Sequence, residues 1–118
     1  MISMREAYEK IGANYEDACA RLMGEEMLAR FALKFLDDES MDKLEAAMAA
    51  GDAEGAFMAA HTLKGVSQNL GFDNLYEPAV VVTEALRGAD AVDGAREGMH
   101  ALQQQYAATL SALREAAE

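Results

Sequence analysis

A histidine, a lysine and a glycine stand close together in the segment His61-Thr62-Leu63-Lys64-Gly65. Positions i, i+3 and i+4 share one surface of an α-helix, so His61, Lys64 and Gly65 lie side by side if this segment is helical. Imidazole is a good nitrogen nucleophile and is mostly unprotonated at neutral pH. The ammonium group of Lys64 can offset the negative charge of a phosphoryl group. The spacing therefore indicates a site for phosphoryl chemistry.

Gly65 stands in the middle of this predicted helix, where glycine costs roughly 0.5 to 1 kcal/mol relative to alanine. Without a side chain at this position, another protein or a phosphoryl group can approach the imidazole of His61 closely. The alternative is that Gly65 allows close packing between helices. Gly55 lies in the same helix and has no such role, so a glycine alone proves little.

A helical projection at about 100° per residue separates two faces of this segment. The predicted core face carries Ala59, Leu63, Val66 and Leu70, and the opposite face carries Glu54, Phe57, His61, Lys64, Gly65 and Gln68. Phe57 is then an exposed aromatic residue beside a histidine, which suggests a docking role, unless an adjoining helix or the N-terminal segment partly covers it. Gln68 and Asn69 are candidates for hydrogen bonds to a phosphate or to a partner, or they belong to an ordinary polar surface.

The rest of the chain predicts a helical scaffold for this site. Apolar residues make up 52% of the 118 residues, tryptophan is absent, and proline occurs once. This composition favours helix nearly throughout. The predicted helices cover 3–11, 15–23, 25–36, 40–50, 52–70, 74–87 and a final helix that follows a turn at 88–93.

Short connections between the later helices favour antiparallel neighbours. We therefore expect one all-α domain over residues 1–118, an antiparallel up-down four-helix bundle at about 25–117 with short additional helices at about 3–23. Ser40, Asp52 and a capping box at Asn74 and Glu77 are the expected helix caps. Pro78 falls in or just beyond the first turn of its helix. The residues expected to face inward are Met27, Leu28, Phe31, Phe35, Leu36, Met41, Leu44, Met48, Leu75, Ala79, Val82, Leu86, Met99, Leu102, Tyr106, Leu110 and Leu113.

Charge and composition argue against several classes of function. The net charge of −11 repels nucleic acid and anionic membranes. Neither a membrane span nor a signal peptide is recognisable, which favours a cytoplasmic location. Cys19 is the single cysteine and is expected to be buried. Glu97 and His100 have the spacing of a metal-ligand pair, but one pair cannot build a metal site, so no metal or other cofactor is expected.

The segment 60–71 resembles the active-site helix of histidine-containing phosphotransfer (HPt) domains. Further landmarks of that family stand in the family's order, and the resemblance covers roughly residues 15–90. They are Arg21-Leu22-Met23-Gly24, Phe35-Leu36, Gly51-Asp52 and the run from Leu75 to Arg87. Pro78 is unusual for the family.

The resemblance implies a relay function rather than autonomous catalysis. His61 is then the phosphoacceptor, at Nε2, Lys64 steadies the phosphoryl group, and Gly65 gives access to a receiver domain. The implied partners are receiver domains of response regulators or of a hybrid sensor histidine kinase, and the partner supplies Mg²⁺. Thr83 is a candidate to orient Nδ1 of His61. No nucleotide-binding loop is recognisable, so we do not expect ATP-dependent kinase activity. A non-catalytic helical adaptor remains the alternative.

Overall fold

The computed structural model describes residues 1–117, which are almost entirely helical and include no strand. The predicted all-α fold is therefore confirmed for this part of the chain. The elements follow in the order α1 (Met4–Ile11), α2 (Tyr15–Leu22), α3 (Glu25–Lys34), the 3-10 turn η1 (Phe35–Asp37), α4 (Ser40–Ala50), α5 (Ala53–Asn69), α6 (Asp73–Leu86), the 3-10 turn η2 (Asp93–Ala95) and α7 (Arg96–Ala117).

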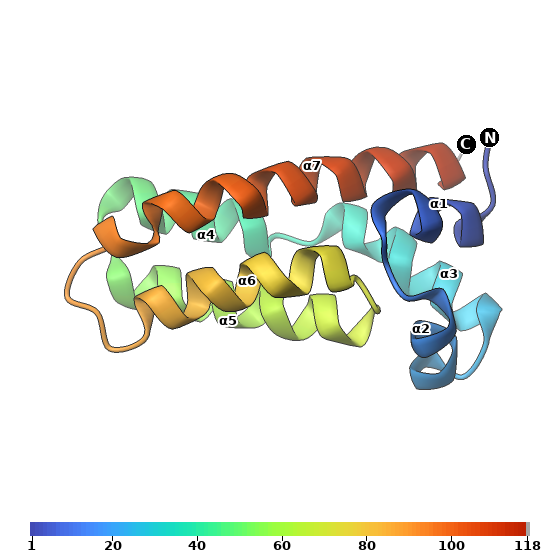
Figure 1. The fold of residues 1–118 in the computed structure, drawn as a ribbon, viewed down its shortest axis with the longest axis horizontal. Coiled ribbons are helices and arrows are strands. Elements are labelled where there is room, and N and C mark those ends of the chain that lie inside the picture. The colour runs from blue at the N-terminus through green and yellow to red at the C-terminus, as the bar shows by residue number, and fades with distance from the viewer. Residues whose placement is uncertain (118) are drawn as a thin grey trace.

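Four helices form the predicted up-down-up-down bundle. The helices α4, α5, α6 and α7 run in alternating directions, and α5 packs against both α4 and α6 (Figure 1). The helix α7 has 22 residues and, at 1.5 Å per residue, is about 33 Å long. It therefore extends beyond the bundle and also covers α3, which precedes α4 along the same side of α7 (Figure 1).

The two predicted N-terminal helices are present and pack at one end of the bundle (Figure 1). The helix α1 lies against α7, where Lys10 forms an ion pair with Glu115 at 2.9 Å, and α2 lies against α3 (Figure 1). Ser3 and Glu6 form a capping box at the start of α1, and the Asn14 side chain caps α2. These caps explain where two such short helices begin.

The N-terminal helices also hold the end of α5. The Tyr8 hydroxyl donates to the Leu70 carbonyl at 2.7 Å, and the Arg21 guanidinium donates to the Gln68 carbonyl at 3.2 Å. The Asn14 backbone N–H donates to the Gly71 carbonyl at 2.8 Å. The carbonyls of Gln68 and Gly71 also accept from the backbone N–H groups of Gly71 and Asp73. The Leu70 carbonyl, at the end of the helix, lacks a helical partner, so the Tyr8 hydroxyl satisfies a group that would otherwise need water. Gly71 has φ of +70°, and an added Cβ would lie 2.6 Å from the Asn14 carbonyl oxygen, so the close approach requires glycine here.

A chain of aromatic rings runs through the core and joins the N-terminal helices to the bundle. Tyr8 contacts Tyr15 and Phe72 with ring centroids 5.4 and 5.3 Å apart. Phe35 in turn contacts Phe72 at 5.3 Å and Tyr106 at 5.9 Å. Three of these contacts are edge-to-face and that of Tyr8 with Phe72 is tilted. Such aromatic pairs stabilise beyond the area they bury, so α1, α2, η1, α7 and the start of α6 share one core.

Two predicted caps are wrong. Ser40 is the first residue of α4 rather than its cap, and its N–H donates to the Asp38 carboxylate at 2.9 Å. The helix α6 begins at Asp73, and the Asn74 amide donates to Gln105 and Thr109 of α7, both at 3.0 Å. Asn74 therefore serves a tertiary contact, which its sequence neighbours do not reveal. Asp52 does cap α5 as predicted, by accepting from the Gly55 N–H at 2.9 Å.

Some residues expected to face inward lie at the surface. Phe31 is 40% exposed and Met27 36% exposed, because α3 packs on α2 and on the end of α7 and leaves its other side open. Cys19 is half-buried rather than buried. Tyr106, Leu110 and Leu36 are also half-buried, whereas the predicted stripe of α6 is buried throughout.

Candidate functional site

The helix α5 presents the predicted site to solvent. His61, Gly65, Gln68 and Asn69 are exposed, while Phe57 and Lys64 are half-buried. The outward orientation of His61 is thus confirmed. The buried face is rotated slightly from the predicted one, since Ala56, Ala60 and Ser67 are buried and Val66 is only half-buried. Small side chains mark the contact with neighbouring helices here, and a projection based on large apolar residues underestimates them.

His61 lies on the ring of Phe57, one turn earlier in α5. The two ring centroids are 5.9 Å apart and the ring planes are inclined by only 21°. The guanidinium of Arg87, the residue that ends α6, lies 5.1 Å from the centroid of the Phe57 ring. An adjoining helix therefore partly covers Phe57, which was the structural alternative to a docking role. The Phe57 ring therefore neighbours both a guanidinium and an imidazole group.

Arg87 and Lys64 both interact with the carboxylate of Glu84 on α6. The Arg87 guanidinium donates to the Glu84 carboxylate, with Nη2 and Oε2 2.8 Å apart. This hydrogen bonding holds the pKa of the Glu84 carboxyl below its usual range, and the charges of Arg87 and Lys64 lower it further. Lys64 therefore interacts electrostatically with the Glu84 carboxylate of α6, and it also lies beside His61 on α5.

Gly65 leaves open space beside His61. A Cβ added to Gly65 would meet no atom within 4 Å, which excludes close helix packing as the reason for glycine at this position. Gly55 differs, because a Cβ there would collide with the Asp52 carboxylate that caps the helix. The two glycines of α5 thus have different physical roles, and only Gly65 opens the surface near His61.

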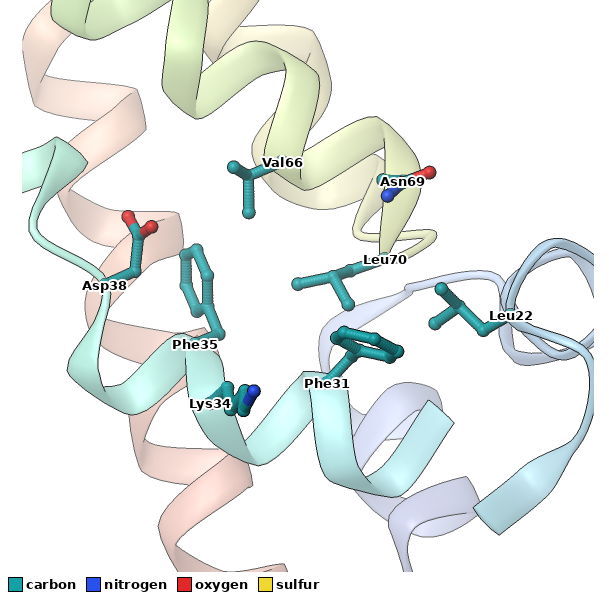
Figure 2. Close-up of a pocket in the computed structure, with 8 residues that line it drawn as sticks. All are labelled: Leu22, Phe31, Lys34, Phe35, Asp38, Val66, Asn69 and Leu70. Atoms are coloured by element: carbon teal, nitrogen blue, oxygen red, sulfur yellow. The ribbon is translucent and has the colours of Figure 1, made fainter. Parts of the chain in front are cut away.

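Asn69 lies between this surface and an apolar groove that residues of α2, α3 and α5 line. Figure 2 shows Leu22, Phe31, Val66 and Leu70 turned toward the same space, with Lys34 and Asn69 at its border. Phe35 and Asp38 complete the lining. Gln68 does not belong to the groove, and its backbone carbonyl is held by Arg21.

Thr83 does not orient His61. It is fully buried, and its hydroxyl donates to the Ala79 carbonyl of the same helix at 2.7 Å. Glu84 and Arg87 are the residues of α6 that reach the His61 surface instead. Their spacing indicates an ion pair within one helix, but the sequence does not show that the pair faces α5. Pro78 lies inside α6, beyond its first turn.

A comparison with protein-family models identifies the scaffold. The model described as the Hpt domain matches residues 26–116 of this chain. The chain belongs to the Hpt domain family. No curated protein and no solved structure gave a match. The matched region begins at Glu26, so α1 and α2, which hold the end of α5, lie outside it.

Membership in the Hpt family defines the general function. Hpt domains carry a phosphoryl group on histidine in two-component signalling, and they act as carriers rather than as catalysts. Their partners are the receiver domains of two-component systems. Within residues 1–117 the Hpt domain has no helix long and apolar enough to cross a membrane, and no group of three or more His, Cys, Asp or Glu residues that would hold a metal ion.

Proposed function

We propose that this Hpt domain relays a phosphoryl group between receiver-domain aspartates through His61 in a multistep phosphorelay. The observation that carries the proposal is the exposure of His61 on α5, with Lys64 and the open surface at Gly65 beside it. His100, the other histidine, lies on α7 at a groove lined by residues of α4 and α7, and none of these groups lines that groove. His61 alone has the surroundings that a phosphoacceptor needs. The cytoplasm, where a receiver domain is available, is the proposed location.

The transfer itself is an in-line displacement at phosphorus. The lone pair of His61 Nε2 forms the new N–P bond while the P–O bond to the partner's aspartate breaks, and that carboxylate keeps the electron pair. Lys64 is placed to offset charge on the phosphoryl oxygens. Mg²⁺ and the groups that activate the aspartyl phosphate come from the receiver domain. Transfer in the other direction follows the same path in reverse.

Docking of the receiver domain involves the surface around His61. Phe57 and Gln68 lie on the same side of α5 as His61, and Asn69 connects this side to the groove between α2, α3 and α5. A standard interface covers about 800 Å² on each partner. A disc of that area centred on His61 reaches Asn69, since eight residues of helix span about 12 Å. We therefore include Phe57, Gln68 and Asn69 in the proposed docking surface.

Phosphotransfer from a radiolabelled, phosphorylated receiver domain in the presence of Mg²⁺ tests this function. We expect acid-labile, alkali-stable label on the wild-type chain, none on His61→Ala, and unchanged labelling on the matched control His100→Ala. Lys64→Ala is expected to slow transfer about tenfold, the effect of losing one charge-assisted contact, while Lys10→Ala should not. Partner binding without any transfer, unaffected by His61→Ala, would instead indicate an adaptor.

A further inference from the structure

Glu84 of α6 and Arg87, which directly follows α6, lie near the Phe57 side chain of α5. The Phe57 ring has two charged or polar neighbours: its centroid lies 5.1 Å from the Arg87 guanidinium carbon and 5.9 Å from the centroid of the His61 imidazole. Arg87 is bound to Glu84, and both side chains are about half exposed, at 55% and 54%. One cation and one anion of α6 therefore stand next to the surface where His61 would gain a phosphoryl group.

The pair of Arg87 and Glu84 is easily rearranged. Ion pairs between exposed side chains contribute little to stability, because water and salt compete for both charges. A phosphoryl group carries a charge of about −1.5 to −2 at neutral pH and offers three acceptor oxygens. The planar guanidinium binds such a group in a bidentate manner. Phosphorylated His61 therefore competes with Glu84 for the Arg87 guanidinium.

From this arrangement we infer that Arg87 and Glu84 set the charge environment of phosphorylated His61, with Arg87 stabilising the phosphoryl group and Glu84 opposing it. On phosphorylation, Arg87 moves from Glu84 toward the phosphoryl oxygens, and the phenyl ring of Phe57 holds the imidazole during this exchange. Arg87 and Glu84 thus set how much of the chain remains phosphorylated. The inference deepens the proposed function, since it takes His61 as the phosphoacceptor.

Phosphorylation of His61 by a small-molecule donor tests the inference without any receiver domain. In the reaction with phosphoramidate, the P–N bond to ammonia breaks as the Nε2–P bond forms, and ammonia leaves with the electron pair. The imidazolium formed in this step gives its Nδ1 proton to solvent. No receiver domain takes part, so labelling of His61 by phosphoramidate remains measurable even if no receiver exchanges phosphate with this chain.

The readout is the pKa of the phosphoryl group on His61, measured by ³¹P NMR titration of the labelled protein. We expect Arg87→Met, which keeps the length of the side chain over Phe57, to raise this pKa by about 0.3 to 0.7 unit, as expected for an exposed charge interaction. Glu84→Gln should lower it by a similar amount. Arg96→Met and Asp93→Asn are the matched controls, because Arg96 and Asp93 form a pair of the same spacing at 3.1 Å, outside the His61 surface.

The lifetime of the phosphohistidine gives a second measurement. Arg87→Met should shorten it and Glu84→Gln should lengthen it, each about two- to fivefold, with no effect of the Arg96 and Asp93 variants. A pKa and lifetime that match wild type in both Arg87→Met and Glu84→Gln would overturn the inference, and so would failure of phosphoramidate to label His61. If the pKa and lifetime change as expected in these variants but no receiver domain transfers phosphate to the chain, only the proposed relay is refuted.

Discussion

Gly65 keeps the surface beside His61 free of side chains, and this has opposite consequences for stability and for transfer. Because an added Cβ would meet no atom within 4 Å, we expect Gly65→Ala to raise the free energy of unfolding by about 0.5 to 1 kcal/mol through better helix propensity. The same methyl group obstructs a close partner, so transfer from a receiver domain should slow about tenfold. Urea unfolding and phosphotransfer rates measure the two effects.

Labelling by phosphoramidate provides the control for this variant, because so small a donor needs little of the space that Gly65 leaves open. We expect it to label Gly65→Ala at the wild-type rate. Transfer from the receiver at the wild-type rate in Gly65→Ala would show that the missing side chain does not serve access to His61.

The sequence predicts the residues of α5 well and those of α6 poorly, for a geometric reason. The relation between His61, Lys64 and Gly65 depends only on the period of one helix, so spacing alone predicts that they share a surface. Which residue of α6 faces His61 depends on how two helices pack. The prediction that Thr83 orients His61 is therefore wrong, and the position of Arg87 over Phe57 follows only from how α5 and α6 pack.

At the scale of helices, the attachment of α1 and α2 to the end of α5 can be tested at Tyr8. Its hydroxyl is buried and donates to the Leu70 carbonyl at 2.7 Å. Tyr8→Phe keeps the ring in the core but leaves this carbonyl without its partner, which costs about 1 to 2 kcal/mol of unfolding free energy. Chemical unfolding followed by circular dichroism measures the loss.

Tyr76→Phe is the matched control, because Tyr76 is half-buried and its hydroxyl has no hydrogen-bond partner among residues 1–117. We expect its stability to stay close to wild type. Equal stabilities of Tyr8→Phe and the wild-type protein would mean that the bond to Leu70 does not hold α1 on the end of α5.

Helix ends show where prediction from the sequence reaches its limit. The cap at Asp52 depends on a neighbour three residues away and is predicted correctly. Asn74 has a side chain equally suited to capping, yet it bonds to Gln105 and Thr109, more than thirty residues later in the chain. Phe31 has the spacing of a core residue, but it lines the open groove between α2, α3 and α5 and stays partly exposed. In both cases the outcome depends on tertiary packing, which local patterns do not contain.

At the scale of the molecule, charge is unevenly distributed. The net charge is −11, yet half of the 10 basic residues lie on α5 or contact or face it. These residues are Lys64 itself, Arg21 at Gln68, Arg87 over Phe57, and Lys34 and Lys43 at grooves that α5 lines. Three of the five are paired with carboxylates: Arg21 with Asp17, Lys43 with Glu39 and Arg87 with Glu84. An acidic chain repels an anionic partner in general, so Lys64, next to His61, is the cation that favours approach of a phosphorylated aspartate.

The aromatic core that joins the N-terminal helices to the bundle predicts a loss of stability in alkali. Burial, together with the hydrogen bond to Glu25, raises the pKa of Tyr15 to about 12, and burial raises the pKa of Tyr8 as well. An unfolded tyrosine ionises near pH 10. Stability from these neutral phenols is therefore complete below about pH 10 and is lost as the pH rises toward the folded-state pKa values, because only the unfolded chain can ionise in this range.

Tyr15→Phe removes one of these two ionisations, so its unfolding free energy should fall less steeply between pH 9 and about pH 11 than that of the wild type. Urea unfolding at a series of pH values measures both slopes, and identical slopes for the two proteins would show that Tyr15 ionises as readily in the folded chain as in the unfolded one.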